Sequence, residues 1–346
     1  MLIRIVASVF LCGLVPARGQ AVPTPTPSVV YLAHDPAAID HFRPNRTVIR
    51  AMVDRLVLSV TGQPDIVRAW SSLVAPGDKV GIKISAAGGE LFATHHDIVD
   101  AIVDGLESAG HRRETIIVWD RWLGEIKAAG YHSGTGGYQL LSIPPREGYD
   151  AKATFTAPVL GNLVWGDLEY HGGKIMPLLP DKENTSSVSH FSRIIASQVT
   201  KIINVPVLSD HPSVGIAGCL YNVTIPNVDN WRRFTDRSGF SGASIAQIYD
   251  DPVVGKKVVL NIMDGLLGQY AGGPEAAPNY SVHHATILAS KDPVAIDTLA
   301  LKQLERWREG ARLPPIGPLA AHVQIAGQSG LGTGEISKIE VKRVER

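Results

Sequence analysis

Five apolar runs, each suited to a buried strand, end on side chains that could do acid–base or ligand chemistry. The runs KVGIKIS, TIIVWD, KIINVPVLSDH, VVLNIMDG and ATILASKD finish on these ionisable residues: Lys83, Asp120, Asp210 with His211, Asp264, and Lys291 with Asp292. In an open parallel sheet, ligands bind beyond the carboxyl ends of the strands, because variable loops and helix N-termini converge there. Turns are also rich in Asp, so ordinary turn or cap residues are the alternative interpretation.

Two of the charged positions are unusual for their surroundings. Lys83 interrupts an apolar strand, and a strand buried on both faces seldom holds a lysine without a partner. Asp297 shares helical spacing with Val294 and Leu301, which puts its carboxylate on the face that packs against the sheet. A buried carboxylate should meet a cation, a metal or several donors, unless it caps the first turn of its own helix.

His211 is the most versatile of these groups. It could serve as a general base, as a metal ligand, or as a hydrogen-bonded turn histidine. The following segment GIAGCLYN is expected to form a helix or tight turn that returns Asn222 toward the same edge. We therefore predict one polar crevice built from seven residues: Lys83, Asp120, Asp210, His211, Asn222, Asp264 and Asp297.

The elements that must position these residues follow an alternating pattern. Apolar residues recur at helical spacing over 46–60 and 65–74, and Thr94-x-x-Asp97 resembles a capping box that starts a helix ending at Gly110. Strand candidates and helix candidates then alternate, and Asp292-Pro293 supplies an N-cap and a first-turn proline for a further helix. The near-continuous Val/Ile runs predict an α/β fold, a mostly parallel sheet with helices on both faces in Rossmann-like layers.

Residues 131–186 depart from this alternation. They are rich in glycine, and short strand-like runs such as YQLLSI, ATFTAPVL, NLVWGDLEY and KIMPLL are separated by turn residues. We predict a β-rich insertion here, followed by a helix over 187–200, a strand over 201–208 and a closing strand at IEVKRV. Residues 29–346 are then a single domain that contains this insertion.

The overall composition limits the partners. The chain has 346 residues, is 45% hydrophobic and balances 33 basic residues with 33 acidic ones. A sequence of this length and apolar content builds a substantial core, and its charge balance provides no overall attraction to nucleic acid or anionic lipid. A small-molecule ligand is the expected partner.

The N-terminus has the pattern of an export signal. Arg4 precedes an apolar run over 5–15, and small residues follow at Ala17, Gly19 and Ala21. This predicts a signal peptide over residues 1–21, a Pro/Thr-rich spacer over 22–28 and a periplasmic or extracellular protein with no membrane span after cleavage. A buried N-terminal helix is the alternative. Removal of the signal leaves Cys219 as the sole cysteine, so no intrachain disulfide or cysteine-ligated cluster is expected.

The order of these motifs resembles the DUF362 proteins, a family named for its unknown function. The similarity extends over about residues 77–335, is weakest in the insertion, and is most specific at DG…GGP (264–274) and DPVAID (292–297). The resemblance places the family's polar positions on these residues: Lys83, Thr94, His211, Asn222, Asp264, Asp292 and Asp297.

The chain also departs from the family pattern. Ser209-Asp210-His211 stands where the family tends to have Lys-x-His, Tyr221-Asn222 stands for Lys-Asn, and Ile84-Ser85 replaces a segment with an asparagine. The two missing lysines weaken the expectation of a shared anionic substrate. Family members joined to ferredoxin-like segments bind iron–sulfur clusters, but this chain lacks the cysteines for one.

These observations favour an exported enzyme that acts on a small polar or anionic molecule, with a divalent metal as one expected cofactor. In this hypothesis His211 is a base or a metal ligand, Asp264 and Asp297 are orienting partners or ligands, and Lys83 contacts the anion. The alternative is an exported ligand-binding protein or assembly factor without catalysis.

Overall fold

The fold is built on one large, mostly parallel sheet. The computed structural model describes residues 27–170, 184–235 and 241–345, so the expected signal peptide lies outside the described residues. The strands of the main sheet stand in this order: β14 (Ile339–Arg343), β1 (Ser28–His34), β13 (Ser281–Ser290), β12 (Val258–Gln269), β9 (Lys201–Val205), β4 (Val80–Ile84), β5 (Ile117–Trp119) and β6 (Gln139–Leu141). Strands β12, β9, β4, β5 and β6 are parallel neighbours, whereas β13 is antiparallel to both β12 and β1. The prediction of an α/β fold is confirmed.

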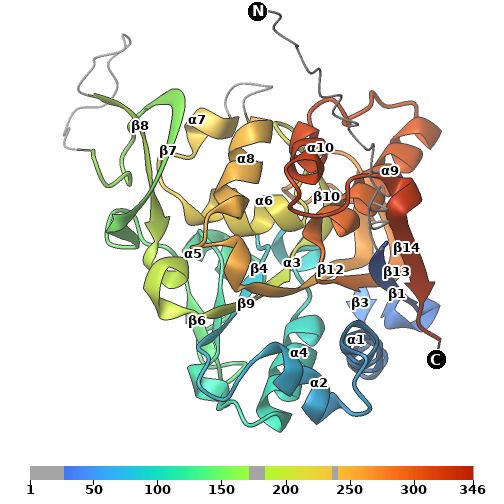
Figure 1. Cartoon of the computed structure of the whole chain (residues 1–346). Coiled ribbons are helices and arrows are strands. Elements are labelled where there is room, and N and C mark those ends of the chain that lie inside the picture. Colours follow the sequence, from blue (N-terminus) through green and yellow to red (C-terminus); the bar gives the residue numbers. More distant parts are fainter. Residues whose placement is uncertain (1–26, 171–183, 236–240, 346) are drawn as a thin grey trace, which may run out of the picture.

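Helices cover both faces of this sheet (Figure 1). Helices α1 (Arg46–Thr61), α2 (Ile66–Leu73) and α4 (His96–Ser108) pack on one face. On the other face lie α6 (Cys219–Thr224), α8 (Ser241–Asp250), α9 (Pro293–Gly310) and α10 (Ala321–Gln328). Two apolar cores result, one on each side. Within the described residues, no helix combines the length and apolar character needed to cross a bilayer.

Short elements connect these layers. They are the helices α3 (Gly89–Phe92), α5 (Leu123–Ala128) and α7 (Arg232–Thr235), and the strand pair β2 (Ile39–Asp40) and β3 (Arg43–Pro44). Helix α5 follows β5 directly and carries side chains to the carboxyl edge of the sheet.

Side-chain caps start helices α1 and α9, and of these the sequence predicts the cap at Asp292 but not the one at Asn45. The Asn45 side chain accepts from Val48 at the start of α1, and Asp292 accepts from Ala295 at the start of α9. The capping box predicted at Thr94 is wrong. The Thr94 hydroxyl instead accepts the Ser85 N–H at 2.9 Å and donates to the Val205 carbonyl at 2.7 Å, so it ties the end of β4 to β9.

The single strand predicted over 201–208 is two strands. Pro206 has no N–H to give to a ladder, and the chain breaks there into β9 and β10 (Val207–His211). Both pieces pair in parallel with β12, and the Pro206 carbonyl accepts the Asp264 N–H at 2.8 Å. Strand β10 also pairs with the short β11 (Gly215–Ile216), so His211 lies at a carboxyl end as predicted.

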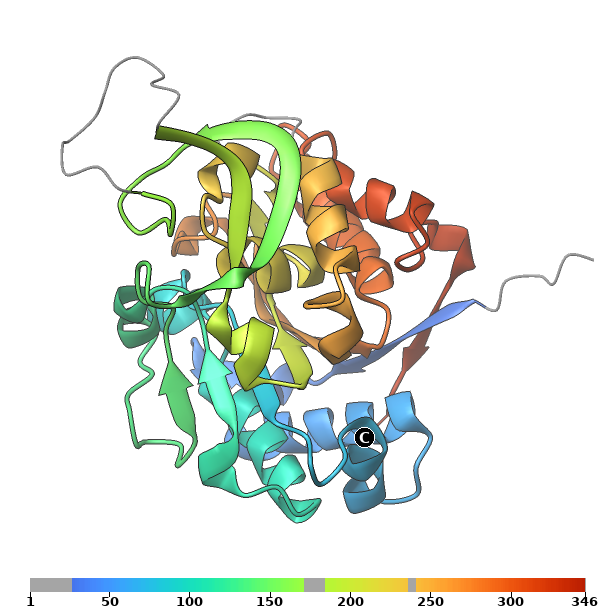
Figure 2. The same ribbon diagram turned by 60° about the vertical axis from the view of Figure 1, so that its left-hand side comes forward.

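The region around residues 131–186 differs in detail from the prediction. Strand β6 belongs to the main sheet, while β7 (Tyr149–Asn162) and β8 (Thr185–Ser192) form a separate antiparallel pair. Figure 2 shows this pair, in green, curving away from the main sheet. The strand predicted over 162–170 is turns and irregular chain after its first residue, and the one predicted over 174–179 lies outside the described residues.

The helix predicted over 187–200 is also wrong. Strand β8 occupies its first half, and only a short π-helical turn (Ile194–Gln198) follows. The physical reason is tertiary, because the Arg233 guanidinium binds the carbonyls of Ala157, Val159 and Ser187 and so joins β7 to β8. Sequence periodicity carries no record of such a distant partner.

Candidate functional site

A polar cavity lies where the carboxyl ends of β4, β5 and β10 meet the start of α6. Its volume is about 320 Å³, and its walls come from the loops after those strands together with α5 and α6. We call it the polar pocket. The carboxylate, guanidinium, imidazole and amide side chains on its walls are Asp120, Arg121, Glu125, His211, Asn222 and Glu275.

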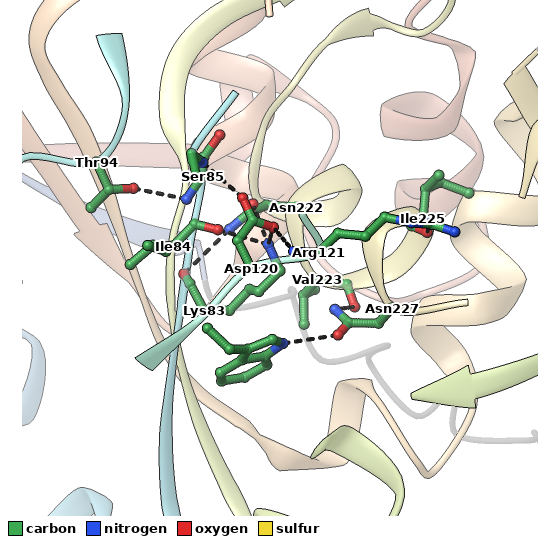
Figure 3. Close-up of polar contacts among 12 residues, drawn as sticks. Lys83, Ile84, Ser85, Thr94, Asp120, Arg121, Asn222, Val223, Ile225 and Asn227 are labelled. Atoms are coloured by element: carbon green, nitrogen blue, oxygen red, sulfur yellow. Dashed lines mark hydrogen bonds and ion pairs between the residues drawn. The ribbon is translucent and has the colours of Figure 1, made fainter. Parts of the chain in front are cut away.

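Lys83 lies directly behind the wall of the polar pocket. Its ammonium group is fully buried and donates to the Asp120 carboxylate at 2.6 Å, the Asn222 side-chain oxygen at 3.1 Å and the Ile84 carbonyl at 2.7 Å (Figure 3). Burial lowers the pKa of Lys83, although Asp120 opposes this effect. All three donors of the ammonium are used, so Lys83 holds two wall residues in place.

Asp120 is similarly saturated by donors. Besides Lys83, its carboxylate accepts the N–H groups of Ala86 at 2.7 Å and Arg121 at 2.8 Å. These bonds connect the loop after β4 to the end of β5. The role of Asp120 in this geometry is to shape the pocket wall, since its oxygens already have partners.

A row of buried amides crosses the sheet behind Asn222. Asn222 donates to Asn204 at 2.8 Å, and Asn204 donates to Asn261 at 2.9 Å. The register explains the row, because Lys83 on β4 pairs with Asn204 on β9, and Asn204 pairs with Asn261 on β12. Fully connected amides of this kind are rigid and fix the orientation of Asn222. Sequence reasoning missed Asn204 and Asn261, although each is a polar residue inside an apolar strand.

Arg121 is the cation of the polar pocket. It is only 6% exposed, and its guanidinium donates to the Ile225 carbonyl at 3.1 Å and the Tyr149 hydroxyl at 3.0 Å. The rings of Trp122 and Trp231 each lie 4.9 Å from its central carbon.

Part of Arg121 remains unsatisfied. Its Nε has no hydrogen-bond partner, and no carboxylate of the described residues forms a salt bridge with it. Burial lowers the pKa of Arg121, but a guanidinium stays charged in proteins. Sequence analysis did not select Arg121; the cluster WDRW at the end of a strand was the available signal.

Thr235 adds a second unpartnered group to the same wall. Its hydroxyl is buried and has no hydrogen-bond partner among the described residues, and the residue lines the polar pocket. Buried polar groups without partners are rare in folded proteins, and here two of them belong to residues of one cavity wall.

Glu125 is the side chain of the polar pocket whose pKa is best placed for proton transfer. Its carboxyl lies on α5, where burial raises its pKa to about 7, and nearby Asp120 adds to the rise while Lys83 opposes it. A carboxyl with a pKa near neutrality can both take and give a proton at physiological pH. The sequence analysis missed Glu125, because nothing in its local pattern distinguishes it from a surface helix residue.

His211 enters the polar pocket as a neutral ring. Its Nδ1 accepts the Ser213 N–H at 3.2 Å, and burial lowers the pKa of His211 to about 4. A ring nitrogen that accepts a hydrogen bond carries no proton, so the neutral ring holds its proton on Nε2. The geometry therefore makes His211 a hydrogen-bond donor through Nε2. Its ring packs against Tyr221 with 4.7 Å between centroids.

A second histidine, near His211, also has a lowered pKa. His322 on α10 is fully buried, and neither of its ring nitrogens has a hydrogen-bond partner in the part of the chain that the structure describes. Burial lowers the pKa of His322 to about 3, and the proximity of His211 contributes to the lowering. Charging either ring in this dry environment is unfavourable.

Three predicted site residues are used elsewhere. Asp264 accepts the His95 N–H at 2.8 Å and contacts the His95 Nδ1 at 2.7 Å, so it anchors the start of α4 to β12. Burial disfavours a charged His95, but Asp264 outweighs this effect and raises the pKa of that ring. Asp210 accepts the Gly273 N–H at 2.8 Å, and burial raises its pKa.

Asp297 is the third of these residues. It accepts the N–H groups of Cys219 at 2.6 Å and Leu220 at 2.9 Å, at the N-terminus of α6. Burial raises its pKa to about 7, while these two backbone bonds act in the opposite direction. Asp297 thus meets several donors, as expected for a buried carboxylate. The alternative, that Asp297 caps its own helix α9, is wrong, because Asp292 is the cap of that helix. Neither Asp210, Asp264 nor Asp297 lines the polar pocket.

The expected divalent metal has no matching ligand set. Among the described residues, no group of three or more His, Cys, Asp or Glu side chains converges as a metal site would require. In the polar pocket, the oxygens of Asp120 and the Nδ1 of His211 already accept protein hydrogen bonds. The described residues of the pocket therefore do not fit a metal.

Comparisons with known proteins add a family but no activity. A family model described as "Domain of unknown function (DUF362)" matches residues 80–302. No curated protein matches the chain. A structural-genomics crystal structure from Thermotoga maritima aligns with 84% of this chain at 12% identity and a TM-score of 0.39. The chain spans 60% of that protein, and a likeness at this level carries no functional conclusion.

Proposed function

The chain belongs to the DUF362 family, and on this premise we propose that it is an enzyme that binds a small anionic molecule in the polar pocket and moves a proton with Glu125. The observation that carries the proposal is the pairing of two groups on one wall. Arg121 is a buried cation without a carboxylate partner among the described residues, and Glu125 is a carboxyl with a pKa raised to about 7. Perturbed titratable groups in a cavity are a characteristic of active sites.

Arg121 supplies the attraction for the anion. A buried guanidinium without a counter-charge is unfavourable, and its contacts with two tryptophan rings offset only part of this cost. A carboxylate or phosphate group in the pocket would supply the missing charge. Arg121 thus takes the anion-binding role that the sequence analysis assigned to Lys83, whose donors are all used.

Glu125 and His211 have complementary roles in this proposal. Glu125 takes or gives the proton, because its two protonation states are similarly populated near pH 7. His211 donates a hydrogen bond through Nε2 to an oxygen of the bound molecule and stabilises negative charge that develops there. This assignment replaces the base role expected for His211, since its pKa of about 4 makes it a weak base.

The test separates binding from catalysis. A panel of small carboxylates and phosphate esters is incubated with the full chain, and NMR follows both ligand binding and product formation. We expect Arg121→Met to weaken binding at least about tenfold, as the loss of one charged hydrogen-bonding partner predicts. Arg232→Met is the matched control, because Arg232 stacks on the same Trp231 but does not line the pocket.

Glu125→Gln then distinguishes an enzyme from a binding protein. We expect this variant to keep the affinity for the ligand and to lose turnover by about 10²-fold or more. A ligand that binds through Arg121 but is never converted would instead favour the non-catalytic ligand-binding protein. An unchanged ligand affinity in Arg121→Met would contradict both hypotheses, the enzyme and the non-catalytic ligand-binding protein.

A further inference from the structure

A second, larger cavity lies at the end of the main sheet formed by β14, β1 and β13. Its volume is about 990 Å³, and it is bounded by strands β14, β1 and β13 on one side and helix α9 on the other. None of the residues that line it also lines the polar pocket. We call it the apolar groove.

Strand register gives the groove an apolar floor. Leu32 on β1 pairs with Leu288 on β13, and both side chains point to the same face because they are register partners in adjacent strands. Leu299 on α9 faces them across the groove. Leu32 and Leu299 are only partly buried, so the floor is an apolar surface that the described residues leave incompletely covered.

Cations without partners stand at the edge of this floor. Arg343 on β14 pairs in register with Leu32, and Lys302 and Arg306 stand one helical turn apart on α9. No hydrogen bond or salt bridge to another described residue is recorded for these three side chains. A groove with an apolar floor and unpaired cations along its edge is complementary to an anionic amphiphile.

The other ionisable side chains of the groove do not neutralise all three of these cations. The lining holds two carboxylates against these three cations: Glu305, which accepts the N–H groups of Ile316 and Gly317, and Glu309 near the end of α9. Burial lowers the pKa of His284 to about 4, with His34 contributing, so this ring is neutral near pH 7. The cations therefore remain in excess along the open edge.

We propose that the apolar groove binds a single free fatty acid, with its alkyl chain along the leucines and its carboxylate among Lys302, Arg306 and Arg343. The volume lies at the upper end of the range for small-molecule pockets, which suits a long flexible chain. This inference is independent of the function proposed for the polar pocket.

Displacement of a fluorescent fatty acid tests the proposal. cis-Parinaric acid is titrated into the full chain, and palmitate, laurate and hexadecanol then compete for its site. We expect saturable one-to-one binding, with palmitate at least about tenfold tighter than laurate, because each buried methylene strengthens binding by up to about fourfold. Hexadecanol should bind about tenfold more weakly than palmitate, since it lacks the charge.

Variants locate the site. Leu299→Glu places a carboxylate on the groove wall and should abolish binding, and the triple change Lys302→Ala, Arg306→Ala and Arg343→Ala should weaken palmitate about tenfold while leaving hexadecanol unchanged. The matched control is Lys342→Ala, because successive side chains on a strand point to opposite faces and Lys342 does not line the groove. Thermal unfolding of each variant establishes that the fold is intact, and the triple variant changes only exposed side chains.

Four results would overturn the proposal. They are the absence of saturable binding, full binding by folded Leu299→Glu, equal affinity for palmitate and hexadecanol, and recruitment of the protein to vesicles of anionic phospholipid in place of free fatty acid. The last result would identify the groove as a membrane-contacting surface.

Discussion

Replacing Glu125 with glutamine should stabilise the protein at alkaline pH and leave its stability unchanged at acidic pH. The carboxyl sits on the polar pocket near Asp120, Lys83, Arg121 and Glu275, and its pKa rises from 4.5 to about 7. Between these values the folded protein keeps a proton that the unfolded chain has released. The free energy of unfolding therefore falls as pH rises through this window.

The magnitude follows from the rise in pKa. At 1.36 kcal/mol per pKa unit, the change from 4.5 to about 7 corresponds to roughly 3.4 kcal/mol. Water reaches part of the carboxyl and screens it, so we expect an effect of about 1–2 kcal/mol. The loss of unfolding free energy caused by the raised pKa of Glu125 is fully present above pH 7 and absent below pH 4.5. Glu125→Gln removes the ionisable group and should raise the free energy of unfolding by that amount at pH 8.

Urea denaturation of the two proteins at pH 4 and pH 8 measures the effect. The reasoning requires a difference of about 1–2 kcal/mol at pH 8 and about zero at pH 4. Glu275→Gln is the matched control, because Glu275 is an exposed carboxylate on the same pocket, and its replacement should change stability by less than about 0.5 kcal/mol. A Glu125→Gln protein that is equally or less stable than the parent at pH 8 would refute the raised pKa and, with it, the proton-transfer role.

Two further experiments examine the buried Lys83–Asp120 ion pair and the hydrogen bonds that Asp297 accepts at the start of α6. Lys83→Met should lower the free energy of unfolding by about 3 kcal/mol, because Asp120 would lose its cation inside the protein. Adding Asp120→Asn should recover part of this loss. If the free-energy changes of the two single variants simply add in the double variant, the two side chains are not coupled. Asp297→Ala should cost about 2–4 kcal/mol and speed hydrogen exchange at the Cys219 and Leu220 amides, which it would leave without an acceptor. Unchanged exchange at those two amides would show that Asp297 does not hold the start of α6.

Much of the fold could be predicted from local chemistry. Continuous Val/Ile runs predicted a mostly parallel sheet, and apolar residues at helical spacing predicted α1 and α2. The Asp292-Pro293 pair predicted the start of α9. These features rest on interactions within about one turn or one strand, which a single segment encodes by itself. The helix wrongly predicted over 187–200 shows the limit of local reasoning, because strand β8 forms there by pairing with the distant strand β7.

The sequence by itself determined that polar side chains gather at the carboxyl edge of the sheet. Parallel strands point the same way, so Asp120 at the end of β5 and His211 at the end of β10 had to emerge on one side. It also determined that Lys83, inside an apolar strand, needed a partner.

Only the tertiary structure decided which partner each polar group has. Asp264 and Asp297 are occupied by backbone N–H groups near the starts of α4 and α6, and Asn204 and Asn261 join the amide row through strand register. The tryptophan at position 231 reaches Arg121 across more than a hundred residues. A buried carboxylate or cation takes the nearest available donor or ring, and which one is nearest depends on how distant elements cross.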